Sequence, residues 1–484
     1  MAEAIGGEST VIGRRRRRVD GAGSLRSVPR AVLDAGHTFR YSGIRVSSAL
    51  LCAAACAGGG DAARDDVERI VSGDTVIVRN HAPLGIWGDT LTIVADLTIG
   101  ALEGSPETMF ADIVSIATRP DGSILVLDRQ AREVREFDPE GRYVRTMGRQ
   151  GSGPGEFQSP MAVRVDPSGR VLVMDGLARR VTVFSADGTL LTTWPVATLR
   201  PSYTLPIDAR GNVYLMIQLP RDSTIPAGQP APERLSYVRY APDGTPGDTV
   251  PAEGWTLVPA GVRRTTFAGR YYTKENFVPL GMSLIHPSGA VLSGTADRYA
   301  FDLHRFTDNG HGDSAAPRLL RIERVVEPAA LTEGESAEWR AYLEAMVERD
   351  VRQRSNITLP PGVTLPPVQP PHFPETGLKP YYRWVSVHSS GRIWVWRYTP
   401  AELRAHDTPP VAGALPLLSW EEPDVQDVFD ADGTFLGTVA LPPGYVISDS
   451  RGDTVWGTMT DELGVDYVFR ARLVPRSEQA NRFF

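Results

Sequence analysis

The residues with the strongest potential for ligand chemistry lie at or just before the starts of predicted strands. Aromatic and cationic side chains dominate this set, and they suit an organic or anionic ligand through stacking and cation–π contacts. The same residue types also fill the space between packed sheets, so plain packing is the alternative interpretation. The ten candidate ligand-binding residues are Asp112, Met161, Tyr203, Tyr271, Tyr272, Lys274, Met282, Arg383, Trp384 and Tyr445.

Catalytic chemistry leaves a weaker pattern. No nucleophile with a neighbouring base and no acid–base pair stands out by spacing, so we assign no catalytic residue. The eight histidines do not recur at equivalent positions where they could face one central site, which argues against zinc. A calcium site built from Asp, Glu and Asn oxygens needs no compact motif. Calcium therefore stays open, with Asp112 as the best-placed carboxylate, and no other cofactor is expected.

Several polar residues occupy equivalent positions of a repeated pattern, which favours structural roles. Asp128 and Asp175 each end a strand and are expected to accept hydrogen bonds from neighbouring turns. His286 and His388 occupy the first position of predicted hairpin turns, where a polar side chain caps the turn backbone. The glycine-rich segment 148–157 lacks the Lys-Ser/Thr of a phosphate-binding loop and is interpreted as a connection.

The elements that position these residues follow from an internal repeat. Residues 116–148 and 163–194 share one template of four short strands with turns that end in glycine. Four short antiparallel strands cannot bury both faces alone, so the unit must stack beside copies of itself. The repeat predicts an all-β fold, a β-propeller with four-stranded antiparallel blades.

Further turn signals bring the number of predicted blades to six. Either residues 73–80 or residues 88–100 are expected to pair with the last strands and close the ring. The first strand of each blade then lines a central channel, and the ten candidates lie at its mouth. The additional turns are at residues 208–211, 286–289, 388–391 and 449–452.

One insertion, residues 328–380, separates predicted blades four and five. A capping box at Thr332 and Glu335 opens a helix, and the proline-rich residues 357–380 after it cannot form sheet interior. We expect a helix and an extended strap, which either fill space on the propeller or form a lid over the channel. The apolar residues at helical spacing are Trp339, Leu343, Met346 and Val347.

Residues 148–184 resemble an NHL repeat, the unit of six-bladed propellers in many secreted bacterial proteins. The G-x-G-x-G-x-F-x-x-P lead-in, the D-x-x-G turn and the V-x-D strand end all match, and residues 95–110 resemble the start of the same propeller group. The usual asparagine after the V-x-D strand is Ala131 in the first repeat and Ala178 in the second. The resemblance implies a scaffold whose members include binding modules, lactonases and lyases, so it does not fix a function.

The N-terminal region belongs to a different class of sequence. Residues 1–45, with five arginines at 14–18, are interpreted as a disordered leader or an early start. Residues 46–70 resemble a bacterial lipoprotein signal with a flexible tether, in which Cys56 is lipidated, although Ala53 stands where leucine is usual. Ordinary cleavage within the same alanines is the alternative. We expect an exported protein that is lipid-anchored to the cell envelope, periplasmic or secreted, with residues 71–484 as the propeller.

Charge and cysteine content narrow the partners. The chain carries 51 Lys and Arg against 58 Asp and Glu, and loss of residues 1–55 would leave 42 against 54, a net charge near −12. An acidic body argues against nucleic-acid binding. Both cysteines, Cys52 and Cys56, lie in the signal-like segment, so the predicted propeller has no disulfide.

These features predict a monomeric, non-catalytic propeller of the cell envelope that binds a small molecule, a glycan or a protein at the channel mouth. A metal-dependent, calcium-type lactonase or lyase on the propeller axis is one alternative. A docking scaffold that uses residues 332–374 as its contact surface is the other.

Overall fold

The computed structural model describes residues 66–196, 204–220, 223–224, 226, 235–250, 264–267, 270–273, 277, 279, 281–305, 319–355, 377–404 and 415–477. Contacts divide the chain into Met1–Gly59 and Gly60–Phe484, and every described residue belongs to the second unit. Cys56, Tyr203, Lys274 and residues 356–376 of the insertion lie outside the described residues. No helix within the described ranges is long and apolar enough to cross a membrane.

The two clear sequence repeats each form a four-stranded antiparallel sheet. Their second strands, β5 and β9, are buried at every position because neighbouring blades cover both of their faces. Leu125 of the first sheet and Val173 of the second share one apolar cluster with Phe157. Blade 1 consists of β4 (Ile113–Thr118), β5 (Ile124–Asp128), β6 (Glu133–Phe137) and β7 (Tyr143–Met147), and blade 2 of β8 (Pro160–Val165), β9 (Val171–Asp175), β10 (Arg180–Phe184) and β11 (Leu190–Pro195).

Blades 3 and 4 depart from the four-strand template in opposite directions. Blade 3 has β12 (Val213–Gln218), β13 (Leu235–Tyr240) and β14 (Pro246–Thr249), and its innermost segment is reduced to a bridge between Ile207 and Val213. Blade 4 gains two outer strands, β2 (Thr75–Asn80) and β1 (Val67–Ser72), with β2 parallel to β20. Its own strands are β17 (Gly281–Ile285), β18 (Val291–Thr295), β19 (Ala300–His304) and β20 (Leu319–Arg324).

Blades 5 and 6 complete the ring. Blade 5 consists of β21 (Tyr382–Val387), β22 (Ile393–Arg397), β25 (Asp424–Phe429) and β26 (Phe435–Leu441), with the short hairpin β23 (Glu402–Leu403) and β24 (Trp420–Glu421) inserted between β22 and β25. Blade 6 consists of β27 (Tyr445–Arg451), β28 (Thr454–Thr460), β29 (Asp466–Pro475) and β3 (Thr90–Ile99). The remaining elements are η1 (Pro106–Thr108), the hairpin of β15 (Arg264–Phe267) with β16 (Arg270–Thr273), and α1 (Glu333–Ser355).

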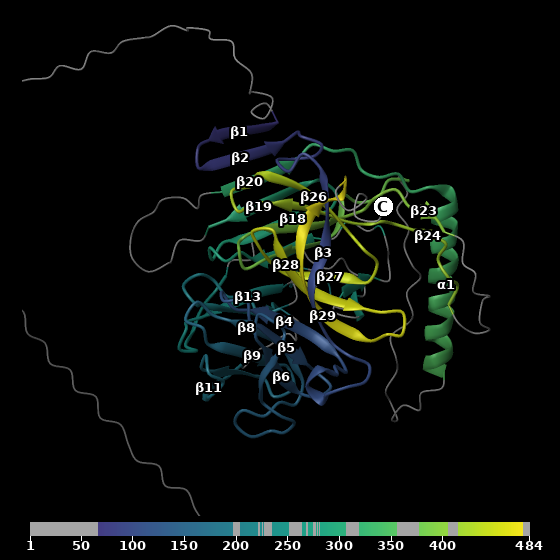
Figure 1. Ribbon diagram of the computed structural model, residues 1–484. Helices are drawn as coiled ribbons and strands as arrows, with labels where there is room; N and C mark the ends of the chain where they lie inside the picture. Colours follow the sequence, from purple (N-terminus) through teal and green to yellow (C-terminus); the bar gives the residue numbers. More distant parts are fainter. Residues whose placement is uncertain are drawn as a thin grey trace, which may run out of the picture. The chain divides into compact units, whose positions relative to one another are not determined.

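Ring closure uses the second of the two predicted N-terminal segments. β3 pairs antiparallel with β29 from Ile99–Val468 to Leu91–Pro475, and it lies among the C-terminal strands (Figure 1). The first segment instead forms β2, which lies between β20 and the outermost strand β1 of blade 4. A strand from one end of the chain therefore finishes the sheet begun by the other end, which removes two exposed edges.

The structural roles predicted for the repeated aspartates are confirmed. Asp175 is fully buried and accepts backbone hydrogen bonds from Gln158, Ser159, Leu177 and Ala178 at 2.6 to 3.1 Å. Each of these donors lies in a connection next to β9, so the carboxylate fixes two loops to one strand end. Asp128 is buried in the same way in blade 1.

The predicted turn-capping role is correct for His286 and wrong for His388. The Ser288 backbone N–H lies 3.1 Å from His286 Nδ1, within its own turn. His388 Nδ1 lies 2.8 Å from Ser450 Oγ on the next blade, and its ring stacks on Trp394 at 5.1 Å. His388 thus hydrogen-bonds to a buried side chain on the neighbouring blade and not to the backbone of its own turn.

Candidate functional site

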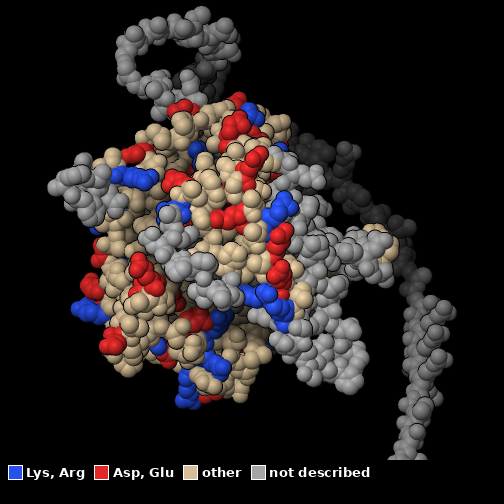
Figure 2. All heavy atoms as spheres, turned by 90° about the vertical axis from the view of Figure 1, so that its right-hand side faces the viewer, with Lys and Arg blue, Asp and Glu red and all other residues tan. Residues whose placement is uncertain are grey.

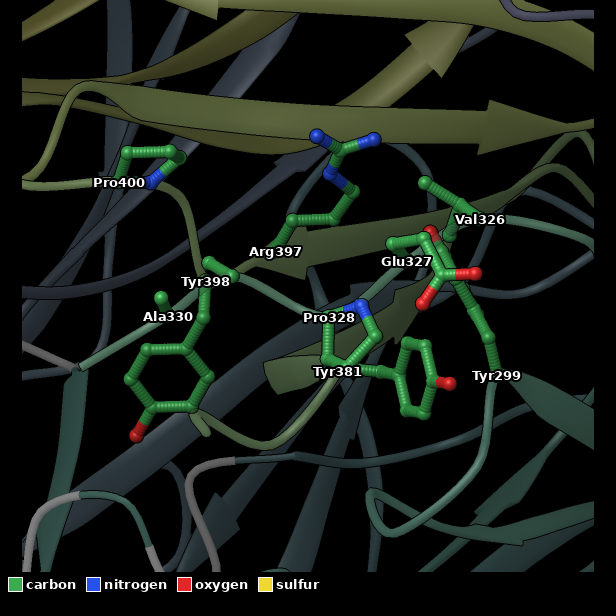
Figure 3. Close-up of a pocket in the computed structure, with 10 residues that line it drawn as sticks. Tyr299, Val326, Glu327, Pro328, Ala330, Tyr381, Arg397, Tyr398 and Pro400 are labelled. Atoms are coloured by element: carbon green, nitrogen blue, oxygen red, sulfur yellow. The ribbon is translucent and has the colours of Figure 1, made fainter. Parts of the chain in front are cut away.

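A pocket of about 240 Å³ lies between blades 4 and 5, at the end of the blades where β21 begins. Its walls come from the turn between β18 and β19, the segment after β20, and the residues that flank the β21–β22 hairpin (Figure 3). The pocket therefore forms only when two consecutive blades stack. The lining residues are Tyr299, Val326, Glu327, Pro328, Ala329, Ala330, Tyr381, Arg397, Tyr398 and Pro400.

A fully buried carboxylate organises the charged side of this pocket. Asp427 on β25 accepts hydrogen bonds from the Tyr299 hydroxyl at 2.7 Å and the Thr438 hydroxyl at 2.8 Å. Arg324 Nε lies 3.0 Å from the same carboxylate, and Arg397 Nη1 lies 3.4 Å from it. Two guanidinium groups thus surround one buried carboxylate, and the exposed carboxylate of Glu327, which lines the same pocket, balances the second positive charge.

The two arginines differ in how many partners their guanidinium groups have among the described residues. Arg324 also donates to the carbonyl oxygens of Ala82 and Pro83 at 3.2 Å, and its guanidinium lies 3.5 Å from the centre of the Phe435 ring. Among the described residues, Asp427 is the hydrogen-bond and ion-pair partner of Arg397. A guanidinium has five N–H donors, so Arg397 keeps donors that can face the pocket.

The aromatic walls are held by their own contacts. Tyr299 and Tyr381 have ring centroids 5.9 Å apart, and the Arg383 guanidinium lies 4.4 Å from the Tyr398 ring. The Tyr398 hydroxyl accepts the backbone N–H of Phe277 at 3.4 Å. Burial, with Asp427 nearby, raises the pKa of Tyr299 well above its ordinary value, so its hydroxyl stays neutral. Tyr381 is half-buried and offers the least committed ring to a ligand.

The predicted helix is present and begins at the predicted cap. The backbone N–H of Glu335 lies 3.2 Å from the Thr332 hydroxyl, which satisfies one of the free donors at the start of α1. Glu338 accepts the backbone N–H groups of Ser419 and Trp420 at 2.7 and 3.0 Å, which fastens α1 to β24 (Figure 1). The segment before the helix, residues 326–330, forms one wall of the pocket.

The outer surface of this region mixes both signs of charge. On the face shown in Figure 2, acidic and basic side chains alternate and do not gather into one large patch of either sign. Exposed residues of α1 include Glu333, Arg340, Glu344, Glu348 and Arg349. Charges of both signs that alternate in this way produce no strong long-range field.

A buried ion cluster joins α1 to blade 5 next to the Tyr398 wall of the pocket. Lys379 is almost fully buried, and its Nζ lies 2.7 Å from Glu335 and 3.2 Å from Glu422 and donates to the Thr399 carbonyl at 2.9 Å. Arg383 reaches the other oxygen of Glu422 at 2.5 Å. Burial raises the pKa of Glu335, and the charge of Lys379 partly offsets that shift. Two cations and two carboxylates therefore balance where the helix meets the propeller.

The charged candidates from the sequence are engaged with other side chains. Asp112 lies 2.7 Å from two nitrogens of Arg129 just before β4. Arg383 is bound to Glu422 and stacked against two aromatic rings.

The apolar and aromatic candidates are spread over the blades. Met161 is buried in the cluster between blades 2 and 3, and Met282 packs against the cluster around Phe301. The Tyr445 ring lies 5.0 Å from the Phe469 ring, and Trp384 is half-buried on β21. Tyr271 and Tyr272 lie on β16, whose side chains are outside the described atoms.

None of the described candidates lines the pocket, although Arg383 contacts its Tyr398 wall. The site residues predicted from the sequence do not include Tyr299, Tyr381, Arg397 and Tyr398. A signal existed for two of them, because Tyr381 and Tyr398 flank the same hairpin as Arg383. Among the residues that the structure describes, no group of three or more His, Cys, Asp or Glu side chains could hold a metal ion.

The stacked four-stranded sheets and the closure by β3 define a six-bladed β-propeller. A family model described as a 6-bladed beta-propeller, DUF5128, matches residues 91–214, which run from β3 to the start of β12. No curated protein matches the sequence.

Solved structures resemble the chain at low identity. A DUF4221 member from Bacteroides vulgatus is 10% identical, with a TM-score of 0.45, over 80% of this chain and 99% of that one. A Bacteroides fragilis protein thought to be exported is 11% identical, with a TM-score of 0.41, over 83% and 99%. A gluconolactonase of Xanthomonas campestris is 12% identical, with a TM-score of 0.34, over 79% and 100%. At these values the likeness carries no conclusion about activity.

Proposed function

We propose that this propeller binds a small ring-shaped organic anion, such as a uronic acid unit of a glycan, in the pocket between blades 4 and 5 and releases it unchanged. The observation that carries the proposal is Arg397, which lines the pocket while its contact with Asp427 is the longest of four at that carboxylate. A guanidinium with spare donors can hold a carboxylate through two parallel hydrogen bonds.

The other lining residues favour a hydroxylated ring over a simple anion. Tyr381 and Pro328 provide flat apolar surfaces on which a sugar ring can lie (Figure 3). Glu327 is exposed at the same pocket and can accept hydrogen bonds from ring hydroxyls. A volume of about 240 Å³ is below the usual range for drug-sized ligands, so a single ring is the natural occupant.

The proposed setting is the cell envelope. Residues 46–56 have the order of a secretory signal that ends in a lipidated cysteine, and the Gly-rich, then acidic segment after Cys56 suits a tether. We therefore propose that the propeller is exported and held at the membrane through Cys56, where glycan fragments would reach it.

Binding of glucuronate and galacturonate, with glucose and galactose as uncharged partners, tests the proposal by calorimetry. The uronic acids are expected to bind and the neutral sugars are not. Arg397→Gln is expected to abolish binding without unfolding the protein, because Arg324 and Tyr299 still satisfy Asp427. Arg321→Gln is the matched control, since Arg321 lies on β20 and pairs with Asp302 outside the lining. Equal binding by Arg397→Gln would contradict the proposal.

The same experiment separates binding from calcium-dependent catalysis. The titrations are repeated with Ca²⁺ and with a chelator, together with a sugar lactone, and the ligand is recovered and identified. The proposal expects the same affinity in both conditions and an unchanged ligand. Calcium-dependent opening of the lactone would favour the lactonase alternative.

A further inference from the structure

A second polar cluster lies at the opposite end of the blades from the pocket. The first strands of blades 1, 2, 5 and 6 contribute to it, and its centre is where β21 and β27 end in their hairpin turns. We call this set the axial cluster. It consists of Ser115, Thr118, Arg164, Ser386, His388, Ser389, Asp449, Ser450 and Arg451.

Arg164 places a guanidinium against the inner edges of two first strands. Its Nη1 donates to the Val163 carbonyl at 2.7 Å, to the Ser115 hydroxyl at 3.1 Å and to the Ile116 carbonyl at 3.4 Å. The backbone N–H of Val163 donates to the Ser115 hydroxyl at 3.2 Å. It therefore points towards β4 and away from β9, the neighbour of β8 in its own sheet. The guanidinium therefore sits on the channel side of β4 and β8.

The described residues provide Arg164 with neutral oxygens but with no carboxylate at ion-pair distance. Burial lowers the pKa of Arg164, and the more distant charge of Asp449 opposes that shift. A half-buried guanidinium without a counter-ion is electrostatically costly, because desolvation is not offset by a nearby negative charge.

Asp449 is already satisfied by its own neighbours. Its carboxylate accepts the Thr118 hydroxyl at 2.6 Å and the Ser389 hydroxyl and N–H at 2.9 Å. Arg451 Nη2 lies 3.6 Å from it. Burial lowers the pKa of His388 to about 4, so the imidazole is neutral near pH 7. The axial cluster thus holds two guanidinium groups and one carboxylate, a net charge of +1.

We propose that the axial cluster is a binding site for a small oxyanion, held by the free donors of Arg164 and reached from the face that carries the hairpin turns. Ser389, which contacts Asp449, is exposed on that face, so the cluster lies close to the surface there. The bound anion would supply the missing negative charge, and hydrogen bonds from a guanidinium to an anion are among the strongest in proteins. This site is separate from the pocket between blades 4 and 5.

Inorganic phosphate is the probe, titrated into the purified protein by calorimetry. The wild type and Arg142→Gln are expected to bind with equal affinity, because Arg142 is exposed and pairs with Asp138 on blade 1. Arg164→Gln is expected to bind at least about tenfold more weakly. Arg397→Gln is expected to bind phosphate normally, so this test does not depend on the proposed pocket.

The inference would be overturned if the wild type did not bind phosphate or if Arg164→Gln bound it with unchanged affinity. If Arg164→Gln does not fold, Arg164→Lys takes its place. Lysine keeps the charge but loses the planar fork, so affinity is expected to fall several-fold. Equal affinity of Arg164→Lys and the wild type would also overturn the proposal.

Discussion

Replacing His388 with glutamine is expected to flatten the loss of stability between pH 7 and pH 4.5. His388 is buried, and it contacts Ser450 through Nδ1 and Ser386 through Nε2. Burial lowers its pKa to about 4; Asp449 opposes this shift, and the charges of Arg164 and Arg392 favour it. The imidazole is therefore neutral in the folded protein over most of this pH range.

The sign and size follow from the two states of the histidine. In the unfolded chain a histidine takes up its proton near pH 6.5, whereas the folded chain does so only near pH 4. Between these values the unfolded state binds more protons, so the free energy of unfolding falls as the pH falls. From pH 7 to pH 4.5 the loss is about 2 kcal/mol for this one group.

Thermal unfolding of the wild type and His388→Gln at half-unit pH steps measures the effect. The quantity compared is the drop in Tm from pH 7 to pH 4.5, so a constant cost of the substitution cancels. His81→Gln is the control, because His81 lies on the surface beside Glu68. Its drop is expected to equal that of the wild type. If the drop in Tm of His388→Gln equals that of the wild type, the argument is refuted, because His388 would then not be a buried neutral base.

Two further predictions address the helix and the N-terminus. Lys379→Met is expected to destabilise the protein by about 3–5 kcal/mol in urea unfolding, because it leaves Glu335 buried without a counter-ion, and adding Glu335→Gln is expected to recover part of the loss. A wild-type midpoint for Lys379→Met would contradict the buried cluster. Mass measurement of the mature protein is expected to show a lipid-modified chain that begins at Cys56 and to lose the modification in Cys56→Ser, whereas an unmodified end would favour ordinary cleavage.

The fold was predictable because it repeats. Strand, turn glycine and strand-ending aspartate recur in blades 1 and 2, and each feature depends on local chemistry that the sequence displays directly. Gly148 is an example: its φ of +78° and a Cβ position 2.1 Å from the Phe157 ring both require glycine. The pairing of β2 with β20 was not predicted. Residues 73–80 and residues 88–100 have the same strand character, so the sequence does not show which of them closes the ring.

The pocket residues were harder to predict because the stacking of blades 4 and 5, and not sequence spacing, brings them together. Tyr299 and Tyr398 are about one hundred positions apart, and each follows a second strand whose pattern is that of ordinary core. Arg397 ends a strand that reads as buried, and only the position of Asp427 on the next strand explains the arginine there. The sequence pointed to the right end of blade 5 through Arg383 but not to the side chains with spare hydrogen-bonding capacity.

The two ends of the blades differ in how much sequence change they can tolerate. At the hairpin end, neighbouring blades are tied by Arg119 to Gly169, Ala209 to Pro287, His286 to Gly391 and Ser389 to Asp449, all at 2.7 to 3.0 Å. At the other end, the pocket walls are loops and an insertion that can vary without breaking the ring. Ligand specificity is therefore expected to reside at the loop end. An oxyanion at the hairpin end would act on the ring itself, since it would neutralise the guanidinium where four first strands converge.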